Sequence, residues 1–310
     1  MKKAHVLVLA LAVTACGGSG KQSTLDNKHP MVVRDDLSLL PRDSELVLGI
    51  NFAQLQQSPL WQKFVVPMLG QGDLGQAQAK FKQLCNFDAL ADTKSIAVGA
   101  KHLSSGAPEV VIVVHGLMRD KVTACLANPS VAAEAQKGHL EIRHDGEVTI
   151  MHDTNKPHAI ALQFLDGETL LAYAAGNPTK ADLQAIQTNQ DTLKTSPAFT
   201  ELYGKIDSKA SMWGLASAAS GLLDKLAEVG MKPKAVFGTL NVTDRLGADV
   251  RMRVDTPDQA TQIAAGLKQQ GQMLTAFVDS FDVTAEGTDV RLAVGMSEQK
   301  IVGLSQMMGN

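Results

Sequence analysis

The order of strand-like and helix-like segments along the chain constrains the fold more than any other feature. The first half has a strand pattern at residues 45–52, a helical region at 54–84, strand patterns at 95–101 and 109–115, and a helix at 119–127. Apolar residues recur every second position in a half-buried strand and every three or four positions in an amphipathic helix. The first half is therefore predicted to run β-α-β-β-α.

The second half repeats this order with few identical residues. Its segments are a strand at 211–216, a helix at 220–230, strands at 235–241 and 248–254, and a helix at 258–270. A period of roughly 150 residues is too long for a solenoid and fits a duplicated domain. We predict an α+β protein with two β-α-β-β-α repeats, antiparallel sheets and hairpins, and helices packed on one face.

We place the first repeat at residues 38–208, where an extra hairpin and helices would also lie, and the second at 209–310. Two hairpin registers follow from keeping apolar residues on one face. The C-terminal hairpin is expected to pair Val283 with Val290 across a two-residue turn. An earlier hairpin is expected to pair Ile142 with Val148 across a three-residue loop.

The chain begins with a short positive segment, Lys2-Lys3, followed by an apolar run that ends at Cys16. A positive start, an apolar run of about a dozen residues and a small-residue end are typical of a secretory signal. The run is too short to span a bilayer, which needs about 20 residues. We therefore interpret residues 1–15 as a signal peptide.

The residues Val13-Thr14-Ala15-Cys16 resemble the lipobox of bacterial lipoproteins. That resemblance implies that the Cys16 thiol receives a diacylglycerol carrying fatty acids such as palmitate, and that cleavage leaves the lipidated cysteine first. It also implies a cell-envelope location with the outer membrane favoured, because Gly17 is not the Asp that often retains such proteins at the inner membrane. Residues 16–37 are rich in Gly, Ser and charge, which predicts a flexible tether.

Two cysteines remain, Cys85 and Cys125. In an exported protein an even pair of thiols favours one disulfide, here joining two helical segments. The competing interpretation is a metal site. No CxxC motif and no nearby Cys/His spacing supports it, so we expect no bound metal and no cofactor.

The lipobox, the segments LPRDSELVLGIN and SPLWQKF, the cysteine pair and the duplicated order together resemble a loose group of exported bacterial lipoproteins of unknown function. This resemblance spans most of residues 38–310. It implies two α+β repeats with curled antiparallel sheets after a lipid anchor. Its motifs are structural and supply no catalytic residue.

The sequence contains no GxSxG, no phosphate loop and no HExxH. Residues 70–75, GQGDLG, match GxGxxG, but they lie within the predicted helical region 54–84 and not directly after a strand, as a dinucleotide-binding turn would. The neighbouring pairs His144-Asp145 and His152-Asp153 are not catalytic pairs by themselves, because adjacent strand residues point to opposite faces. The formal net charge of -3 and the lack of Lys/Arg runs argue against nucleic-acid binding.

Three functional hypotheses remain. The first is a lipid-anchored envelope protein with a non-catalytic binding or interaction role, whose partner is the membrane and an envelope protein or apolar ligand. The second is a carrier or sensor of an apolar ligand such as a lipid. The third is a hydrolase without a recognisable motif. The second is motivated by a set of apolar residues in the second half: Met212, Trp213, Phe237, Met252, Met273, Phe277 and Phe281.

Overall fold

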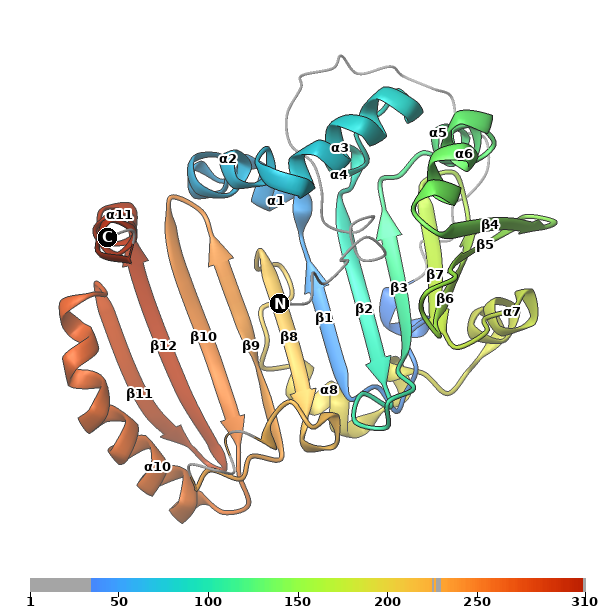
Figure 1. Ribbon diagram of the computed structural model, residues 1–310. Helices are drawn as coiled ribbons and strands as arrows, with labels where there is room; N and C mark the ends of the chain where they lie inside the picture. Colours follow the sequence, from blue (N-terminus) through green and yellow to red (C-terminus); the bar gives the residue numbers. More distant parts are fainter. Residues whose placement is uncertain (1–34, 225, 227–229, 309–310) are drawn as a thin grey trace.

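In the computed structural model, which describes residues 35–308 apart from 225 and 227–229, the strands form one antiparallel sheet of twelve (Figure 1). Its order is β11-β12-β10-β9-β8-β1-β2-β3-β7-β6-β5-β4. The strands are β1 (Leu46–Ile50), β2 (Ser95–Lys101), β3 (Glu109–His115), β4 (Leu140–Asp145), β5 (Val148–Asp153), β6 (Ala159–Phe164), β7 (Thr169–Ala175), β8 (Met212–Ser217), β9 (Ala235–Val242), β10 (Arg245–Arg253), β11 (Ser280–Glu286) and β12 (Asp289–Ser297).

Strands β1 and β8 pair at the centre of this sheet. The order outward is β1, β2, β3, β7, β6 on one side and β8, β9, β10, β12, β11 on the other, with β5 and β4 added to the first side. The α+β class is therefore confirmed, with one continuous sheet. The internal duplication stays a prediction, because a matching strand order does not establish that the two halves superpose.

Short helices fill the connections between the strands. They are η1 (Asp36–Ser38), α1 (Phe52–Gln57), η2 (Trp61–Val65), α2 (Val66–Leu69), α3 (Gly72–Cys85), α4 (Ala89–Asp92), α5 (Arg119–Leu126), α6 (Pro129–Lys137), α7 (Lys180–Thr188), η3 (Leu193–Thr195), α8 (Pro197–Tyr203), η4 (Ala218–Ser220), α10 (Pro257–Gln270), η5 (Gly271–Ala276) and α11 (Glu298–Met308). No helix among the described residues is long and apolar enough to cross a membrane.

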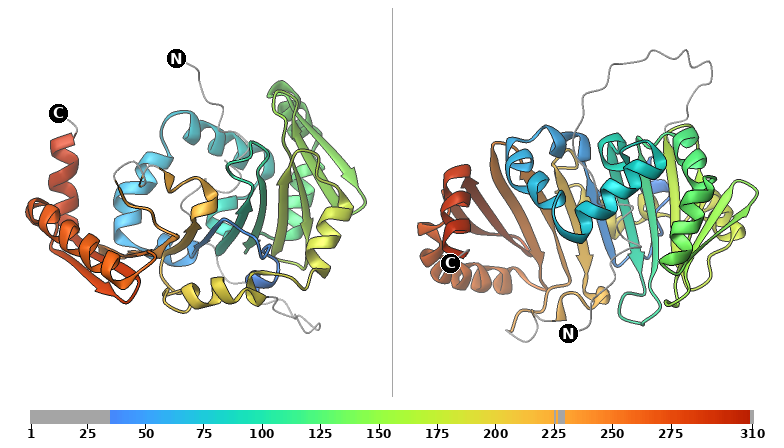
Figure 2. Two further views of the ribbon diagram at one scale, coloured as in Figure 1. Left: turned by 90° about the horizontal axis from the view of Figure 1, so that it is seen from below. Right: turned by 45° about the horizontal axis from the view of Figure 1, so that its top comes forward.

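Helices cover both faces of the sheet, which corrects the expectation of one covered face. The sheet is curled, with α1 to α3 on its inner side and α8 on its outer side (Figure 2). The central strands explain this arrangement. In β3, Val113 faces the outer core and Val114 the inner core, and both are buried. A strand that is apolar on both faces needs cover on both.

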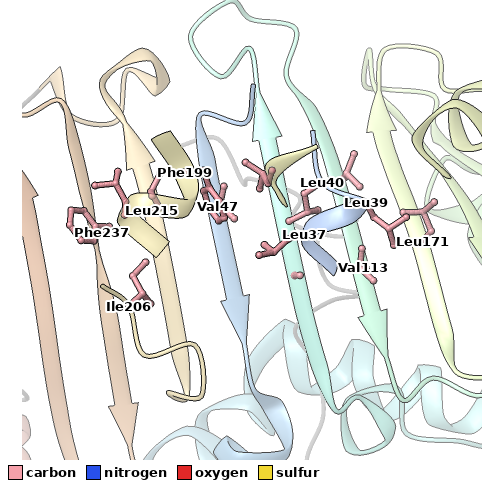
Figure 3. Close-up of a cluster of buried hydrophobic side chains, with 14 of the residues drawn as sticks. Leu37, Leu39, Leu40, Val47, Val113, Leu171, Phe199, Ile206, Leu215 and Phe237 are labelled. Atoms are coloured by element: carbon pink, nitrogen blue, oxygen red, sulfur yellow. The ribbon is translucent and has the colours of Figure 1, made fainter. Parts of the chain in front are cut away.

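The outer core lies under η1, η3, α7 and α8 (Figure 3). Leu37 and Leu40 pack there, so the turn around η1 belongs to the folded body. Ser196 caps the N-terminus of α8 by accepting the Phe199 N–H at 3.4 Å, and α8 places Phe199 against the sheet. A separate cluster forms where α10 packs on β11 and β12.

Both predicted hairpin registers are wrong. Val283 pairs with Leu292, two residues beyond the expected partner, and Ile142 pairs with Met151 across a two-residue turn that begins at Gly146. A shift of two residues keeps every side chain on its face, so the alternation alone could not select the C-terminal register.

Candidate functional site: a partly exposed apolar sheet face

The inner face of the second half of the sheet is apolar across four adjacent strands. Met212 of β8, Leu240 of β9, Ala248 of β10 and Val294 of β12 lie in one cross-strand row. The next row contains Val250 and Leu292, which pair with one another. All six side chains are partly exposed, and we call these six residues the open apolar face.

The open apolar face lies between two covered sections of the same side of the sheet. Toward β11, helix α10 buries Met252, Val283 and Val290. Toward β2, Ile96 is buried among side chains that include Phe52 of α1. The described helices therefore cover the sheet on either side and leave the middle partly uncovered.

Gly238 contributes to the shape of this face. A Cβ atom at Gly238 would lie 2.2 Å from the Asp249 carbonyl oxygen and 2.7 Å from the Val250 Cα. No side chain fits there without a shift of β10, so the strand pair needs glycine at this position.

The outer face of the same strands is charged and paired. Arg291 binds Asp249 through two N–H groups at 2.6 and 2.8 Å, and Arg251 binds Glu286 at 2.6 Å. One sheet thus has an ion-paired outer face and an apolar inner face over β10 and β12. Antiparallel strands with one solvent-exposed face commonly place polar residues on that face and apolar residues on the other. Here, however, the described residues do not fully cover the apolar face.

A buried carboxylate joins this charged face to the region around α8. Asp289 is fully buried and pairs with Arg253 through both carboxylate oxygens, while Lys205 binds it at 2.5 Å. Burial raises the pKa of Asp289, but the hydrogen bonds from Arg253 and Lys205 outweigh burial and hold it below its ordinary value. Every group in this network is paired, which is typical of a structural link.

The apolar residues that motivated the ligand hypothesis differ in exposure. Phe237 and Met252 are buried, Phe281 packs against the cluster under α10, and Trp213 packs against Tyr203 with ring centroids 5.1 Å apart. Met273 and Phe277, in and after η5, are 79% and 40% exposed. The set therefore mixes core with surface, and only Met212 belongs to the open apolar face.

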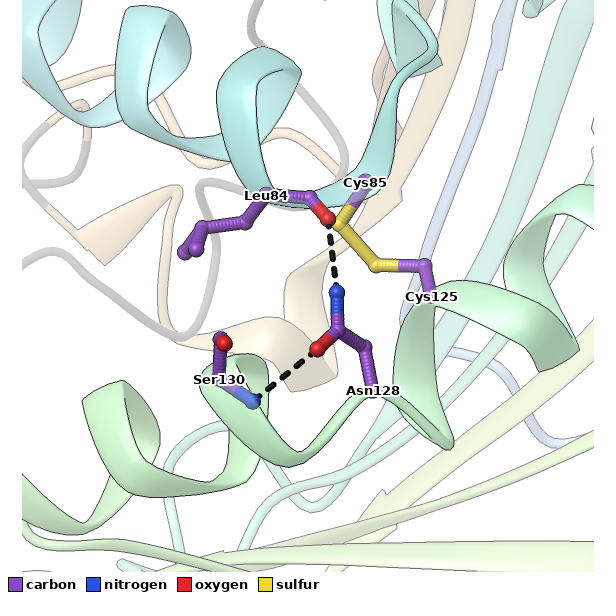
Figure 4. Close-up of a disulfide and its surroundings, with 5 residues drawn as sticks. All are labelled: Leu84, Cys85, Cys125, Asn128 and Ser130. Carbon is purple, nitrogen blue, oxygen red and sulfur yellow. Dashed lines mark hydrogen bonds between the residues drawn. A yellow bond between two sulfur atoms is a disulfide. The ribbon is translucent and has the colours of Figure 1, made fainter.

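The predicted disulfide is present. Cys85 ends α3, Cys125 lies in α5, and their Cα atoms are 4.7 Å apart (Figure 4). Beside the bridge, the Asn128 side-chain amide donates to the Leu84 carbonyl at 3.0 Å, and its oxygen caps α6 by accepting the Ser130 N–H. Together these contacts join α3, α5 and α6 over the inner core. Cys16 lies outside the described residues.

The histidines singled out in the sequence do not converge. His144 contacts the Thr149 hydroxyl at 3.1 Å, and His152 contacts the Lys156 carbonyl at 3.2 Å. Within residues 35–308, leaving out 225 and 227–229, no group of three or more His, Cys, Asp or Glu side chains is placed to hold a metal ion.

A different histidine forms a cluster that the sequence did not reveal. His115 Nε2 lies 2.7 Å from Asp36 Oδ1, and its Nδ1 lies 3.2 Å from the Thr169 hydroxyl. The hydrogen bond to Asp36 raises the pKa of His115 against the opposing effect of burial. These residues are 79 and 54 positions apart, so no short motif could have indicated them.

This cluster has the residue types of a hydrolase triad, but its geometry argues for a structural role. Thr169 is buried, and the N–H groups of Glu168 and Thr169 are both bound by Asp166 Oδ1, at 2.8 and 2.7 Å. A nucleophile must reach its substrate, and a tetrahedral intermediate needs free donors beside it. The cluster instead links η1, β3 and the start of β7.

The fold and the open face together define a class: an α+β protein built on one curled antiparallel sheet, with a partly exposed apolar inner face. No family model and no curated protein matches the chain. Among solved structures, it is similar to crystal form III of the bacterial protein TP0453, with a TM-score of 0.53 and 8% identity. The match covers 86% of this chain and 96% of that one. At that identity the likeness shows the fold alone.

Proposed function

We propose that this is a lipid-anchored protein of the bacterial cell envelope with a non-catalytic binding role, and that its open apolar face binds an apolar ligand such as a lipid acyl chain. The observation that carries the proposal is the run of partly exposed apolar side chains across β8, β9, β10 and β12. Soluble proteins rarely expose contiguous apolar patches of large area unless these serve binding.

Burial of this face supplies the driving force. Removing apolar surface from water contributes about 25 cal/mol per Å². A chain that covers about 200 Å² of the face would therefore gain roughly 5 kcal/mol before the costs of association are subtracted. The open apolar face contains no charged residue, so binding there leaves no charge buried without a partner.

The N-terminal sequence supports the same role. A signal peptide over residues 1–15, lipidation of Cys16 and a tether that ends before η1 would hold the folded body beside a bilayer. Gly17 in place of Asp favours the outer membrane. A protein confined to a membrane surface meets acyl chains at high local concentration.

Native mass spectrometry of the full chain purified from membranes tests the proposal. We expect a population carrying extra mass that is released into organic solvent as an acyl-chain lipid, beyond the covalent lipid on Cys16. A protein that carries only its covalent lipid, and that gains no mass when incubated with phospholipid, would contradict an acyl-chain ligand.

A further inference from the structure

Strand β4 ends the sheet on one side, and its outer edge has no partner strand among the described residues. The turn after β4 has two residues, so the flanking pair Asp145–Val148 exchanges both backbone hydrogen bonds. Successive β4–β5 pairs farther from the turn then alternate between non-hydrogen-bonded and hydrogen-bonded. Counting back along β4, the backbone groups of His144, Ile142 and Leu140 point away from β5. These three residues present unpaired N–H and C=O groups at the edge.

Strand β11 ends the sheet on the other side, where α10 packs on its inner face and buries Val283. On β4, Glu141, Arg143 and His144 are all exposed. A free edge strand is a template for pairing with another chain, and charged side chains on it block the pairings that would set like charges opposite one another.

We propose that β4 pairs with β4 of a second copy of this chain, antiparallel and about a two-fold axis at Ile142. In this register Ile142 faces its own copy and Leu140 faces His144, as three hydrogen-bonded pairs. Glu141 then faces Arg143 twice, in the pairs that bring side chains closest. The result is a closed dimer with one continuous sheet, because a two-fold contact uses the same surface of both subunits.

Among two-fold axes at Glu141, Ile142 and Arg143, the charges favour the axis at Ile142. A two-fold axis at Arg143 would oppose the two Arg143 side chains and set Glu141 against Asp145. An axis at Glu141 would oppose the two Glu141 side chains. Like charges directly opposite one another disfavour strand pairing, so only the axis at Ile142 is self-complementary among these three.

Charge reversal tests the dimer. The proteins compared are the full chain, Glu141→Arg, Arg143→Glu and the double variant, each purified from membranes and measured by sedimentation velocity. We expect the unaltered chain to dimerise, each single variant to lose about tenfold or more in affinity, and the double variant to recover. An equimolar mixture of the two single variants should form a heterodimer, since each then faces the opposite charge.

The mixture also controls for folding, because a misfolded variant would not pair with the other. A chain that stays monomeric up to about 100 µM, or one whose single variants dimerise as well as the unaltered chain, would overturn the proposal. The inference does not depend on the apolar ligand, and Leu240→Lys is expected to leave the dimer unchanged.

Discussion

At the scale of single residues, the most informative contacts join positions far apart in the chain. Asp289 binds Arg253 and Lys205, and Asp36 binds His115. No local sequence pattern predicts such pairs, because each residue taken alone looks like an ordinary charged surface residue. The fold brings them together, and burial then makes the pairing necessary.

The His115–Asp36 contact predicts a pH dependence of stability. The pKa of His115 is raised in the folded state, so protonated His115 favours folding. This contribution is fully present below the unfolded pKa of about 6.5 and is lost as pH rises through the raised folded value. Urea unfolding of the wild type and Asp36→Asn should therefore differ most near pH 5.5 and converge near pH 9.

The matched control for that measurement is Asp182→Asn. Asp182 caps α7 through Thr179 and makes no contact with His115. Its effect on the free energy of unfolding should be the same at both pH values. An equally pH-independent effect of Asp36→Asn would contradict the assigned role of His115.

At the scale of elements, periodicity predicted what the segments are but not how they register. The strands expected at 95–101 and 109–115 have those bounds in the structure, and the helix expected at 258–270 begins one residue earlier. Alternation defines a strand and its faces, whereas pairing depends on turn geometry. In β5, Val148 and Met151 are buried on opposite faces, so a single apolar face could not select the pairing of β4.

The disulfide is also an element-scale feature, and it was predictable because the predicted export signal implies an oxidising environment for an even cysteine pair. Its loop spans 40 residues. In the chain-entropy model such a bridge contributes about 4 kcal/mol. The double variant Cys85→Ala/Cys125→Ala should unfold at a lower temperature and expose α3 and α5 to faster hydrogen exchange, with β10 to β12 much less affected.

Cys85→Ala alone and Cys125→Ala alone serve as comparisons for the bridge. Each single substitution also removes the disulfide, so both variants should unfold at nearly the same temperature as the double variant. Any difference would come from the one unpaired thiol that each retains. Unfolding at the wild-type temperature in all three would show that the bridge contributes nothing to stability.

At the scale of the whole molecule, one curled sheet has different chemistry on its two sides. In the second half the outer face is held by ion pairs among Asp249, Arg251, Glu286 and Arg291, and the inner face is apolar. The hypothesis of an apolar ligand was one of three, and it came from a set of residues that proved to be partly core. The open apolar face could not be identified from the sequence, because exposure depends on which strands the helices leave uncovered.

Lipidation at Cys16 is a prediction about the whole molecule, because it decides where the folded body resides. Cys16→Ala expressed in a bacterial host should move the protein from the membrane fraction to the soluble envelope fraction and abolish labelling by a radioactive fatty acid. Cys85→Ala, which leaves the lipobox intact, should stay with the membranes. Unchanged labelling of Cys16→Ala would refute the lipobox.

The central claim is that the inner face of β9 and its neighbours binds an acyl chain, and one matched pair of variants tests it most directly. Leu240 lies on the open apolar face, while Thr239 lies on the outer face opposite Asp249. Titration of a fluorescent fatty acid should show binding to the wild type and Thr239→Lys, and at least tenfold weaker binding to Leu240→Lys. Equal binding by both lysine variants, or no binding by the wild type, would contradict the account.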